Sequence, residues 1–338
     1  MKLFTIIARD IHIKAVKVKI TRLFLAIVLL CLVSCQSRED IPEVEAQELA
    51  HITELPDSSF FSDLRQLTVS GNRIYALDVD RRQVLSLDKD LGNLQVFGSG
   101  GRGPTELTGP FTFALQGGLV LIHDSFGCTV KYYDMAGYKS KRSVEFTPDD
   151  YRWYAKGDEF WMHPRITDSL IVRSSPKRDR FFGEPHRFGT ERKTSIMNTC
   201  SVLDYMGEPL MVYTMQPYAR HYSVDGALKR EIDLSGAEFY GRNMAYIASR
   251  PTEENSAYIL HQDAVTDGSS LYILCPRYGD QYLVDRIVEI DLPSGRTLRV
   301  IRLPKGVYNS IAVDKDTIYA FNSRRCSLDV LAINQQPR

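Results

Sequence analysis

The stretch GNRIYALD at Gly71–Asp78 decides the fold, because five altered copies of it follow along the chain. Each copy reads as a turn followed by a short apolar strand. The later copies begin at Gly117, Gly157, Gly207, Gly268 and Lys315. Equivalent apolar positions in consecutive copies lie 40 to 61 residues apart, which is the range in which four-stranded β-propeller blades repeat. The sequence therefore predicts an all-β chain folded as a six-bladed β-propeller.

The first blade can be placed strand by strand. Alternating apolar, β-branched and aromatic residues predict strands at 64–70, 74–78, 83–88 and 94–97. Aspartate followed by glycine recurs where third strands end, as in Asp88 with Gly92. We interpret these pairs as hairpin turns, because the alternating acidic residues of calcium-binding loops are absent.

The last copy is one strand short. The chain ends soon after residues 317–322 and 327–334, which we expect as its second and third strands. An unclosed ring would leave an unpaired strand edge. We expect residues 48–55, ELAHITEL, to supply the missing outer strand. The N-terminal strand would then complete the last blade and close the propeller of residues 48–338.

The N-terminal segment reads as an export signal. Basic residues precede an apolar run of eleven residues at 23–33, which is too short to cross a bilayer. Leu32-Val33-Ser34-Cys35 follows and resembles the bacterial lipobox, whose cysteine is acylated after the signal is removed. The resemblance implies a lipoprotein signal peptide at 1–34 and a lipid on Cys35 that anchors the protein to the outer membrane.

Residues 35–47 are rich in acidic side chains, and we expect an exposed tether there. An acidic run after the lipidated cysteine resembles a surface-export signal of some Gram-negative gut anaerobes, and a merely solvated linker explains it equally well. The body would then lie in the periplasm or on the cell surface. Basic and acidic residues are balanced, with 42 of each, which gives no electrostatic argument for a nucleic-acid partner.

Four further cysteines follow the tether, and no pair has zinc-finger spacing. Three disulfide pairings, or free buried thiols, are all open from the sequence. The cysteines are Cys128, Cys200, Cys275 and Cys326.

The stretch FGSGGRGPTEL at 97–107 carries a family resemblance. It resembles the G-x-G-P-G-E signature after the first blade in six-bladed β-propeller lipoproteins of Gram-negative gut anaerobes, a TolB-like group close to NHL repeats. Thr105 stands where that family usually has glycine. The resemblance covers about residues 35–338 and implies the fold, an envelope location and a binding function. The glycines do not form a phosphate loop, since no G-K-[ST] and no helix follow.

Catalysis has no clear sequence motif. The seven histidines include no H-E-x-x-H pair, and no G-x-S-x-G elbow is present. We therefore predict no metal, cofactor or catalytic residue. The alternative is a propeller enzyme of the calcium-dependent lactonase or lyase kind, because VYNSIAVD at 307–314 is similar to lactonase inner strands. In those enzymes an asparagine placed like Asn309 binds calcium. The other candidate ligands here are Asp63 in the first blade and Gln262-Asp263 in the fifth.

Two kinds of loop meet at one end of a propeller, the connections between blades and the loops between second and third strands. We predict a shallow ligand site there, at the channel mouth. Arginine side chains match carboxylates and phosphates, and tyrosines stack on sugars, so we expect an anionic or carbohydrate-like ligand, or a peptide or protein partner. The predicted residues are Arg102, Arg277, Tyr278, Asn309 and Arg324, with Tyr240 and Tyr246 as a flanking lid.

Each part of this site has a structural alternative. The arginines could brace neighbouring blades, and the insertion 235–256, which carries both lid tyrosines, could pack on the ring. A second insertion, 174–193, is basic and is expected to be an irregular solvated loop. The expected function is that of a lipid-anchored envelope binding or scaffold protein.

Overall fold

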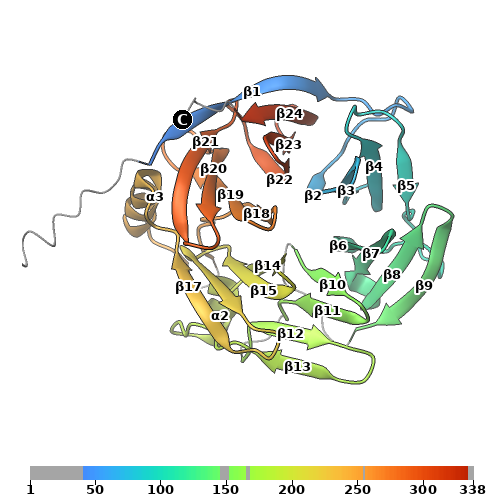
Figure 1. Ribbon diagram of the computed structural model, residues 1–338, viewed down its shortest axis with the longest axis horizontal. Coiled ribbons are helices and arrows are strands. Elements are labelled where there is room, and N and C mark those ends of the chain that lie inside the picture. The colour runs from blue at the N-terminus through green and yellow to red at the C-terminus, as the bar shows by residue number, and fades with distance from the viewer. Residues whose placement is uncertain (1–40, 145–151, 165–167, 254–255, 334–338) are drawn as a thin grey trace, which may run out of the picture. The chain divides into compact units, whose positions relative to one another are not determined.

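The computed structural model describes residues 41–144, 152–164, 168–253 and 256–333. The chain from Ile41 onward is one compact unit, in which short twisted sheets are arranged in a ring (Figure 1). This is the architecture of a β-propeller. The expected signal peptide, Cys35 and the tether up to residue 40 lie outside the described residues.

Four sheets have four antiparallel strands each, which follow the chain from the centre outward. The first agrees closely with the strands expected from sequence and contains β2 (Leu64–Ser70), β3 (Arg73–Asp78), β4 (Gln83–Asp88) and β5 (Gln95–Phe97). The second contains β6 (Pro110–Gln116), β7 (Leu119–Asp124), β8 (Thr129–Asp134) and β9 (Gly137–Ser143). The third contains β10 (Tyr154–Lys156), β11 (Glu159–Met162), β12 (Ile171–Ser174) and β13 (Asp179–Phe182). The fourth contains β14 (Cys200–Tyr205), β15 (Glu208–Tyr213), β16 (Tyr218–Tyr222) and β17 (Leu228–Asp233).

The remaining strands form one eight-stranded sheet, in the order β18-β19-β20-β21-β1-β24-β23-β22. The N-terminal strand β1 joins its two halves. Residues 43–45 of β1 pair in parallel with β21, and residues 46–52 pair antiparallel with β24. The bounds are β18 (Asp263–Thr266), β19 (Ser270–Arg277), β20 (Leu283–Asp291), β21 (Arg296–Arg302), β1 (Glu43–Ile52), β22 (Tyr308–Asp314), β23 (Thr317–Asn322) and β24 (Ser327–Ile333).

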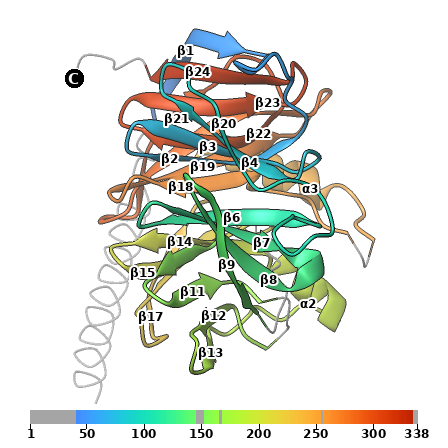
Figure 2. The ribbon, with the colours of Figure 1, turned by 90° about the vertical axis from the view of Figure 1, so that its right-hand side faces the viewer.

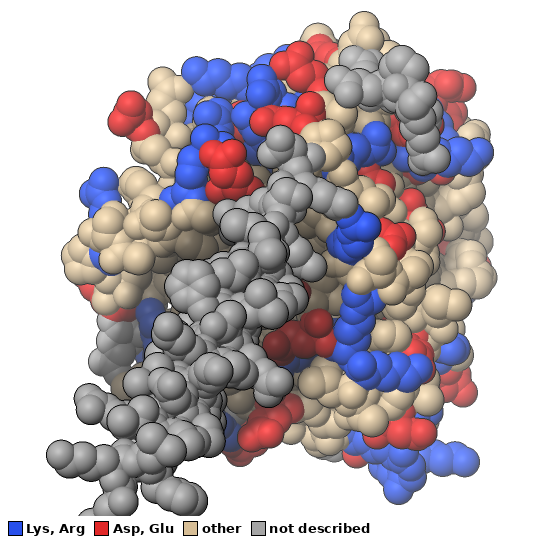
Figure 3. Space-filling model, turned by 60° about the vertical axis from the view of Figure 1, so that its left-hand side comes forward, with Lys and Arg blue, Asp and Glu red and all other residues tan. Residues whose placement is uncertain are grey.

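Strand β1 agrees with the expected closing strand in its partner β24, but it begins earlier than predicted. Residues 43–47, which the sequence predicts as tether, are part of the sheet. Their carboxylates explain the difference, because Glu43 and Glu45 each lie 3.0 Å from the Arg302 guanidinium on β21. Arg286 also lies 3.0 Å from Glu43. In Figure 3, acidic and basic side chains lie close together on this side of the unit.

The recurring turn has one backbone feature in common. Its first residue has a positive φ in all six copies, which L-residues other than glycine adopt at a cost. Glycine meets this requirement in five copies, and in the last copy Lys315 takes a φ of 55°. The repeat motif therefore records a turn geometry that each sheet needs.

The core lies between neighbouring sheets. Buried apolar side chains of the first sheet, such as Leu77 and Val84, pack against Phe113 and Ile122 of the second. The innermost strands are β2, β6, β10, β14, β18 and β22, as Figure 1 shows. Each of these strands is an edge strand of its sheet. Its backbone groups that face the ring centre therefore have no neighbouring strand and need other hydrogen-bond partners.

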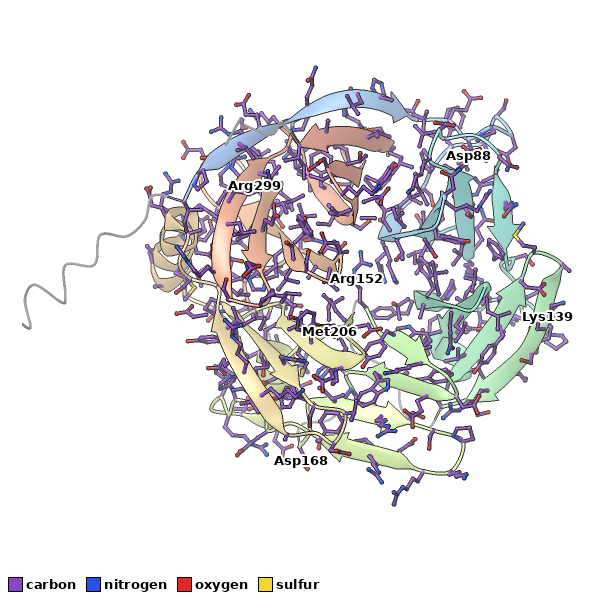
Figure 4. All side chains as sticks on the ribbon, in the orientation of Figure 1. Asp88, Lys139, Arg152, Asp168, Met206 and Arg299 are labelled. Carbon is purple, nitrogen blue, oxygen red and sulfur yellow. The ribbon has the colours of Figure 1, made fainter. Side chains whose placement is uncertain are left out.

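Polar side chains near the ring centre supply two such sets of partners. Gln66 donates to the backbone oxygen of Phe113 and accepts from its N–H, at 2.8 and 3.0 Å. Arg152 and Asp263 bind the backbone of Ile311 in the same way. Arg152 donates to the Ile311 oxygen at 3.0 Å, and the Ile311 N–H donates to Asp263 at 2.9 Å. Figure 4 places Arg152 at the centre of the ring.

The glycine-rich stretch 97–107 folds back on itself as a structural loop. Glu106 accepts a hydrogen bond from the N–H of Gly103 at 2.6 Å, and Gly101 donates to the backbone oxygen of Leu107. A Cβ on Gly101 would lie 1.9 Å from the Glu106 carboxylate. Glycine is therefore required at position 101, because the Glu106 carboxylate lies too close for a Cβ. This agrees with the interpretation of these glycines as turn residues.

The insertion 174–193 differs from expectation. The sequence predicts an irregular loop, but strand β13 forms inside it, with Asp179 to Phe182 paired against Ser174 to Ile171 of β12. Helix α2 (Glu191–Met197) begins near its end and is capped by the Thr190 hydroxyl. The second insertion contains α3 (Glu238–Ala248). Figure 2 shows both helices toward the same side of the ring.

Candidate binding surface at the connection end

The two ends of the ring differ in the loops they carry. We call the end where the innermost strands begin the connection end, and the end where they turn into second strands the hairpin end. The helices α2 and α3 precede innermost strands and so belong to the connection end. The loop between β19 and β20 lies there as well, because it follows a second strand.

Four tyrosines gather at this end, and we call them the tyrosine cluster: Tyr246, Tyr258, Tyr278 and Tyr282. Tyr246 and Tyr278 are stacked, with ring centroids 5.3 Å apart and an interplanar angle of 9°. Tyr258 lies edge-on to both, at 6.3 and 5.4 Å. Tyr282 lies 5.8 Å from Tyr278 and is 42% exposed. The cluster is thus a partly exposed aromatic surface.

Helix α3 positions the cluster through its side-chain spacing. Phe239, Tyr240 and Asn243 are buried against the ring, at positions that share one helix face. The Asn243 amide donates to the backbone oxygen of Pro276 at 2.7 Å and accepts from the N–H of Tyr278 at 3.2 Å. These two bonds fix the β19–β20 loop to the helix, so that Tyr278 lies against Tyr246.

The local environment keeps Tyr278 a neutral hydrogen-bond donor. Its hydroxyl donates to the backbone oxygen of Ile259 at 2.8 Å. Burial, with a smaller contribution from Tyr282, raises the pKa of Tyr278 above its ordinary value. The ring therefore serves as a fixed apolar face and not as an acid or base near neutral pH.

Arginines surround the tyrosine cluster. The guanidinium of Arg250, an exposed residue, lies 4.8 Å from the centroid of the Tyr246 ring, a cation–π contact. Arg324 donates to the backbone oxygen of Tyr282 at 2.9 Å. Arg277 lies 3.1 Å from the buried Asp285 carboxylate and is 44% exposed. Arg277 and Arg324 thus have bracing contacts, as the structural alternative for these arginines expects.

The structure brings together four of the seven predicted site residues: Tyr246, Arg277, Tyr278 and Arg324. Tyr240 is not among them. It is fully buried, with its hydroxyl 3.3 Å from Cys275 Sγ, and cannot form a lid. The prediction for Tyr240 is wrong because the residue lies on the ring-facing side of α3, as packing of the insertion on the ring expects.

The other two predicted residues lie apart from the tyrosine cluster. Arg102 is exposed in the connection between β5 and β6. Asn309 lies at a register shift near the start of β22, where its amide donates to Asp63 at 3.2 Å. The side-chain hydrogen bond of Asn309 is thus with Asp63 and not with a tyrosine of the cluster.

The candidate calcium ligands have protein partners. Asp263 is bound by Arg152 through two hydrogen bonds of 2.6 and 2.7 Å. Asp63 is bound by Asn309, and the Arg65 guanidinium lies 4.0 Å away. Among the described residues no group of three or more His, Cys, Asp or Glu side chains could hold a metal ion. The Asp263 carboxylate is therefore paired with the guanidinium cation of Arg152.

Sequence reasoning missed two members of this surface, Arg250 and Tyr282. Tyr258, just after the insertion 235–256, is an aromatic residue that the sequence already places at this end of the ring. The missing signal was the helix over 238–248, because the turn that follows its end places Arg250 beside Tyr246. The cysteines of the ring differ in exposure, since Cys200 and Cys275 are buried whereas Cys128 and Cys326 are exposed.

Of the known proteins compared with this chain, only solved structures match it. A member of the DUF4221 family from Bacteroides vulgatus matches with a TM-score of 0.60 at 7% identity, over 88% of this chain and 100% of that one. The chain has a β-propeller fold. An exported protein of Bacteroides fragilis matches with a TM-score of 0.55 at 11% identity, over 88% of this chain and 99% of the other.

A third propeller of similar fold is an enzyme. A catalytically inactive variant of virginiamycin B lyase from Staphylococcus aureus, solved with quinupristin, matches with a TM-score of 0.51 at 10% identity, over 86% of this chain and 99% of the other. No family model and no curated protein matches the sequence. In the described residues, no helix is long and apolar enough to cross a membrane.

Proposed function

We propose that this protein is a lipid-anchored binding protein of the bacterial envelope, which captures an acidic glycan on the tyrosine cluster. The observation that carries the proposal is the stack of Tyr246 on Tyr278, with the Arg250 guanidinium over the Tyr246 ring. Flat aromatic faces suit sugar rings, and guanidinium groups suit carboxylates. The exported Bacteroides protein of similar fold supports the envelope location.

Two finer points belong to the same proposal. The eight-stranded sheet acts as two blades that share β1, which gives a six-bladed ring closed by its N-terminal strand. Residues 1–34 are a lipoprotein signal peptide, and Cys35 carries the lipid. The pairing of β1 with β24 and the lipobox resemblance of residues 32–35 support these points.

Binding tests the tyrosine cluster directly. The chain from Ile41 onward should bind uronic-acid-rich polysaccharides more tightly than neutral ones, as measured by affinity electrophoresis and calorimetry. Tyr246→Ala should weaken binding by about tenfold or more, because it removes the stacked face. Tyr246→Phe keeps the ring and should bind like the parent. Phe181→Ala removes a 47% exposed ring on β13 and serves as the matched control.

Two results would count against this assignment. One is an acidic glycan whose affinity is the same in Tyr246→Ala and in Phe181→Ala. The other is a panel of acidic polysaccharides that all fail to bind the folded protein while a peptide binds it.

The anchor is tested separately in cells. The full chain should incorporate labelled palmitate and partition with membranes, and Cys35→Ala should abolish both. Labelling that persists in the alanine variant would end the lipobox interpretation. It would leave the proposal for the tyrosine cluster intact, since that cluster lies in the part of the chain tested from Ile41.

Binding is preferred here over lactonase or lyase chemistry because of Asp263. A calcium lactonase would need this carboxylate for the metal, and its two oxygens are bound by Arg152. Stoichiometric calcium in the purified protein, together with turnover of a lactone, would favour the enzyme instead.

A further inference from the structure

The ring encloses a second place where a small molecule could be held. A cavity of about 340 Å³ lies between the innermost strands, lined by their middle and last residues. Its lining includes Thr68, Ser70, Asp204 and Thr266, which lie toward the hairpin end of their strands, and Arg152 from the connection side. The cavity is therefore distinct from the tyrosine cluster, which lies at the connection end.

Arg152 and Asp263 close the cavity on the connection side. Their side chains are 6% and 4% exposed, and they bind each other through two hydrogen bonds. Two of the Arg152 nitrogens are committed to Asp263. The third, Nη1, has one long contact of 3.4 Å, to the Thr68 hydroxyl. A guanidinium nitrogen carries more than one N–H, so Nη1 retains donor capacity beside the cavity.

The hairpin side is open to solvent. Ser70 and Asp204 are exposed, and Thr68 and Thr266 are half-buried. The hydroxyls of Thr68, Ser70 and Thr266 can each donate and accept, whereas the Asp204 carboxylate only accepts. The outer backbone edges of the innermost strands also face the ring centre, and Gln66, Arg152 and Asp263 satisfy such groups at Phe113 and Ile311. Toward the hairpin end of the cavity, the backbone N–H and C=O groups of the strand edges are further hydrogen-bond donors and acceptors.

The charge and size of the cavity restrict its ligand. Asp263 neutralises Arg152, so Asp204 remains the one lining charge without a cationic partner among the contacts of the described residues, and acidic ligands are disfavoured. The volume of about 340 Å³ is at the lower end of the ~300–1,000 Å³ usual for ligand pockets. Groups that both donate and accept suit a mixed lining of hydroxyls and backbone edges.

We propose that this cavity binds a small neutral polyhydroxylated ligand, of the size of a mono- or disaccharide, which enters from the hairpin end. Hydroxyl groups of the ligand bond to Thr68, to Asp204 and to the strand edges, and Arg152 Nη1 donates to the most deeply bound oxygen. This site does not depend on the tyrosine cluster, from which the Arg152–Asp263 pair separates it.

Saccharide titration tests the proposal with the chain from Ile41 onward. Neutral mono- and disaccharides should bind at millimolar or lower concentration by calorimetry and by ligand-observed NMR. In the Tyr246→Ala variant, which disables the tyrosine cluster, uronic acids should bind at least about tenfold more weakly than neutral sugars. Ser70→Trp, which places a large ring at the cavity rim, should abolish binding. Thr68→Val keeps the side-chain shape but loses the hydroxyl and should weaken binding by a few-fold to about tenfold.

Matched variants distinguish binding in this cavity from binding elsewhere on the ring. Asp134→Asn alters a half-buried turn aspartate on the β8–β9 hairpin, paired with Lys139, and should bind like the parent. Asp204→Asn should weaken neutral saccharides and relieve the penalty on uronic acids. Circular dichroism should show that each variant is folded. Tyr246→Ala should leave this binding unchanged, even if the glycan proposal for the tyrosine cluster fails.

Three outcomes would overturn the proposal. The first is that no neutral saccharide in the panel binds the folded protein at millimolar concentration. The second is that, in the Tyr246→Ala variant, a uronic acid or a dipeptide binds more tightly than every neutral sugar. The third is neutral saccharide binding that is unchanged in both Ser70→Trp and Thr68→Val.

Discussion

At the scale of single residues, the same physical need is met by different chemistry in different sheets. The backbone of Phe113 is bound by one amide, Gln66, and that of Ile311 by an ion pair, Arg152 with Asp263. The turn that precedes each second strand is formed by glycine in five copies and by Lys315 in the sixth. Such departures from the repeat identify positions where a substitution has a defined effect.

Lys315→Gly should stabilise the protein. Lys315 is exposed and has a φ of 55°, a left-handed conformation that costs an L-residue about 1 kcal/mol relative to glycine. The expected gain in the free energy of unfolding is about 0.5–1 kcal/mol, measured by urea denaturation. Lys141→Gly, in the exposed strand β9, is the control and should destabilise by a similar amount. A loss of stability in Lys315→Gly would contradict this account of the turn.

His123 should make the protein less stable as the pH falls. Burial lowers the pKa of His123 to about 4, and its ring nitrogens have no hydrogen-bond partner in the described part of the structure. The unfolded chain binds a proton near pH 6.5, so the free energy of unfolding should decline from about pH 6.5 to about pH 4. This decline precedes the protonation of most carboxylates.

The His123→Leu variant should show a shallower decline of melting temperature across that pH range. A residual slope is expected, because burial also lowers the pKa of His261 to about 4. A parallel pH profile for His123→Leu and the parent would show that His123 is not the source.

At the scale of elements, strand β1 combines two kinds of pairing. Its first residues run parallel to β21 and its later residues antiparallel to β24, and each part has its own ion pairs. Glu43 and Glu45 meet Arg302, and Glu48 lies 2.9 Å from Arg325. Because the contacts are divided in this way, the stability contributed by β1 should be divisible too.

Truncation should therefore lower stability in two steps. A chain from residue 47 loses the parallel pairing and should melt below the chain from Ile41. A chain from residue 56 loses all of β1, exposes the edges of β21 and β24, and should melt lower still or aggregate. Thermal unfolding of the three chains is the measurement. Equal melting temperatures for the chains from residues 41 and 56 would contradict a closing role for β1.

Much of the element pattern could be predicted from sequence, because turn glycines and apolar alternation are local signals. Strands β2 and β4 have the predicted bounds. The parallel pairing of β1 could not be predicted, since it depends on arginines that lie about 250 residues away. From the sequence, Tyr240 and Tyr246 are predicted to form one lid, because the helix that carries both is not recognised. The helical period turns Tyr240 toward the ring, where it is buried in the core.

At the scale of the whole molecule, the ring separates two surfaces. The tyrosine cluster and both helices lie at the connection end, whereas the cavity beneath Arg152 faces the hairpin end. The repeated strands form the ring. The two candidate sites are formed by features that are not repeated, namely helix α3 with the β19–β20 loop and the Arg152–Asp263 pair. Figure 4 shows Arg152 at the centre of the ring, where it binds Asp263 of β18 and the backbone of Ile311 in β22.

The pairing of β1 also has a mechanical consequence. A force applied at Ile41 and resisted by the rest of the ring acts along β1, so the hydrogen bonds to β24 are loaded in shear, many at once, and not unzipped one by one. In single-molecule stretching between Ile41 and a handle on β8, the rupture force should therefore be that of strands pulled apart in shear. If the chain is anchored through residues that precede Ile41, as proposed above, strand β1 is the element that bears the tension.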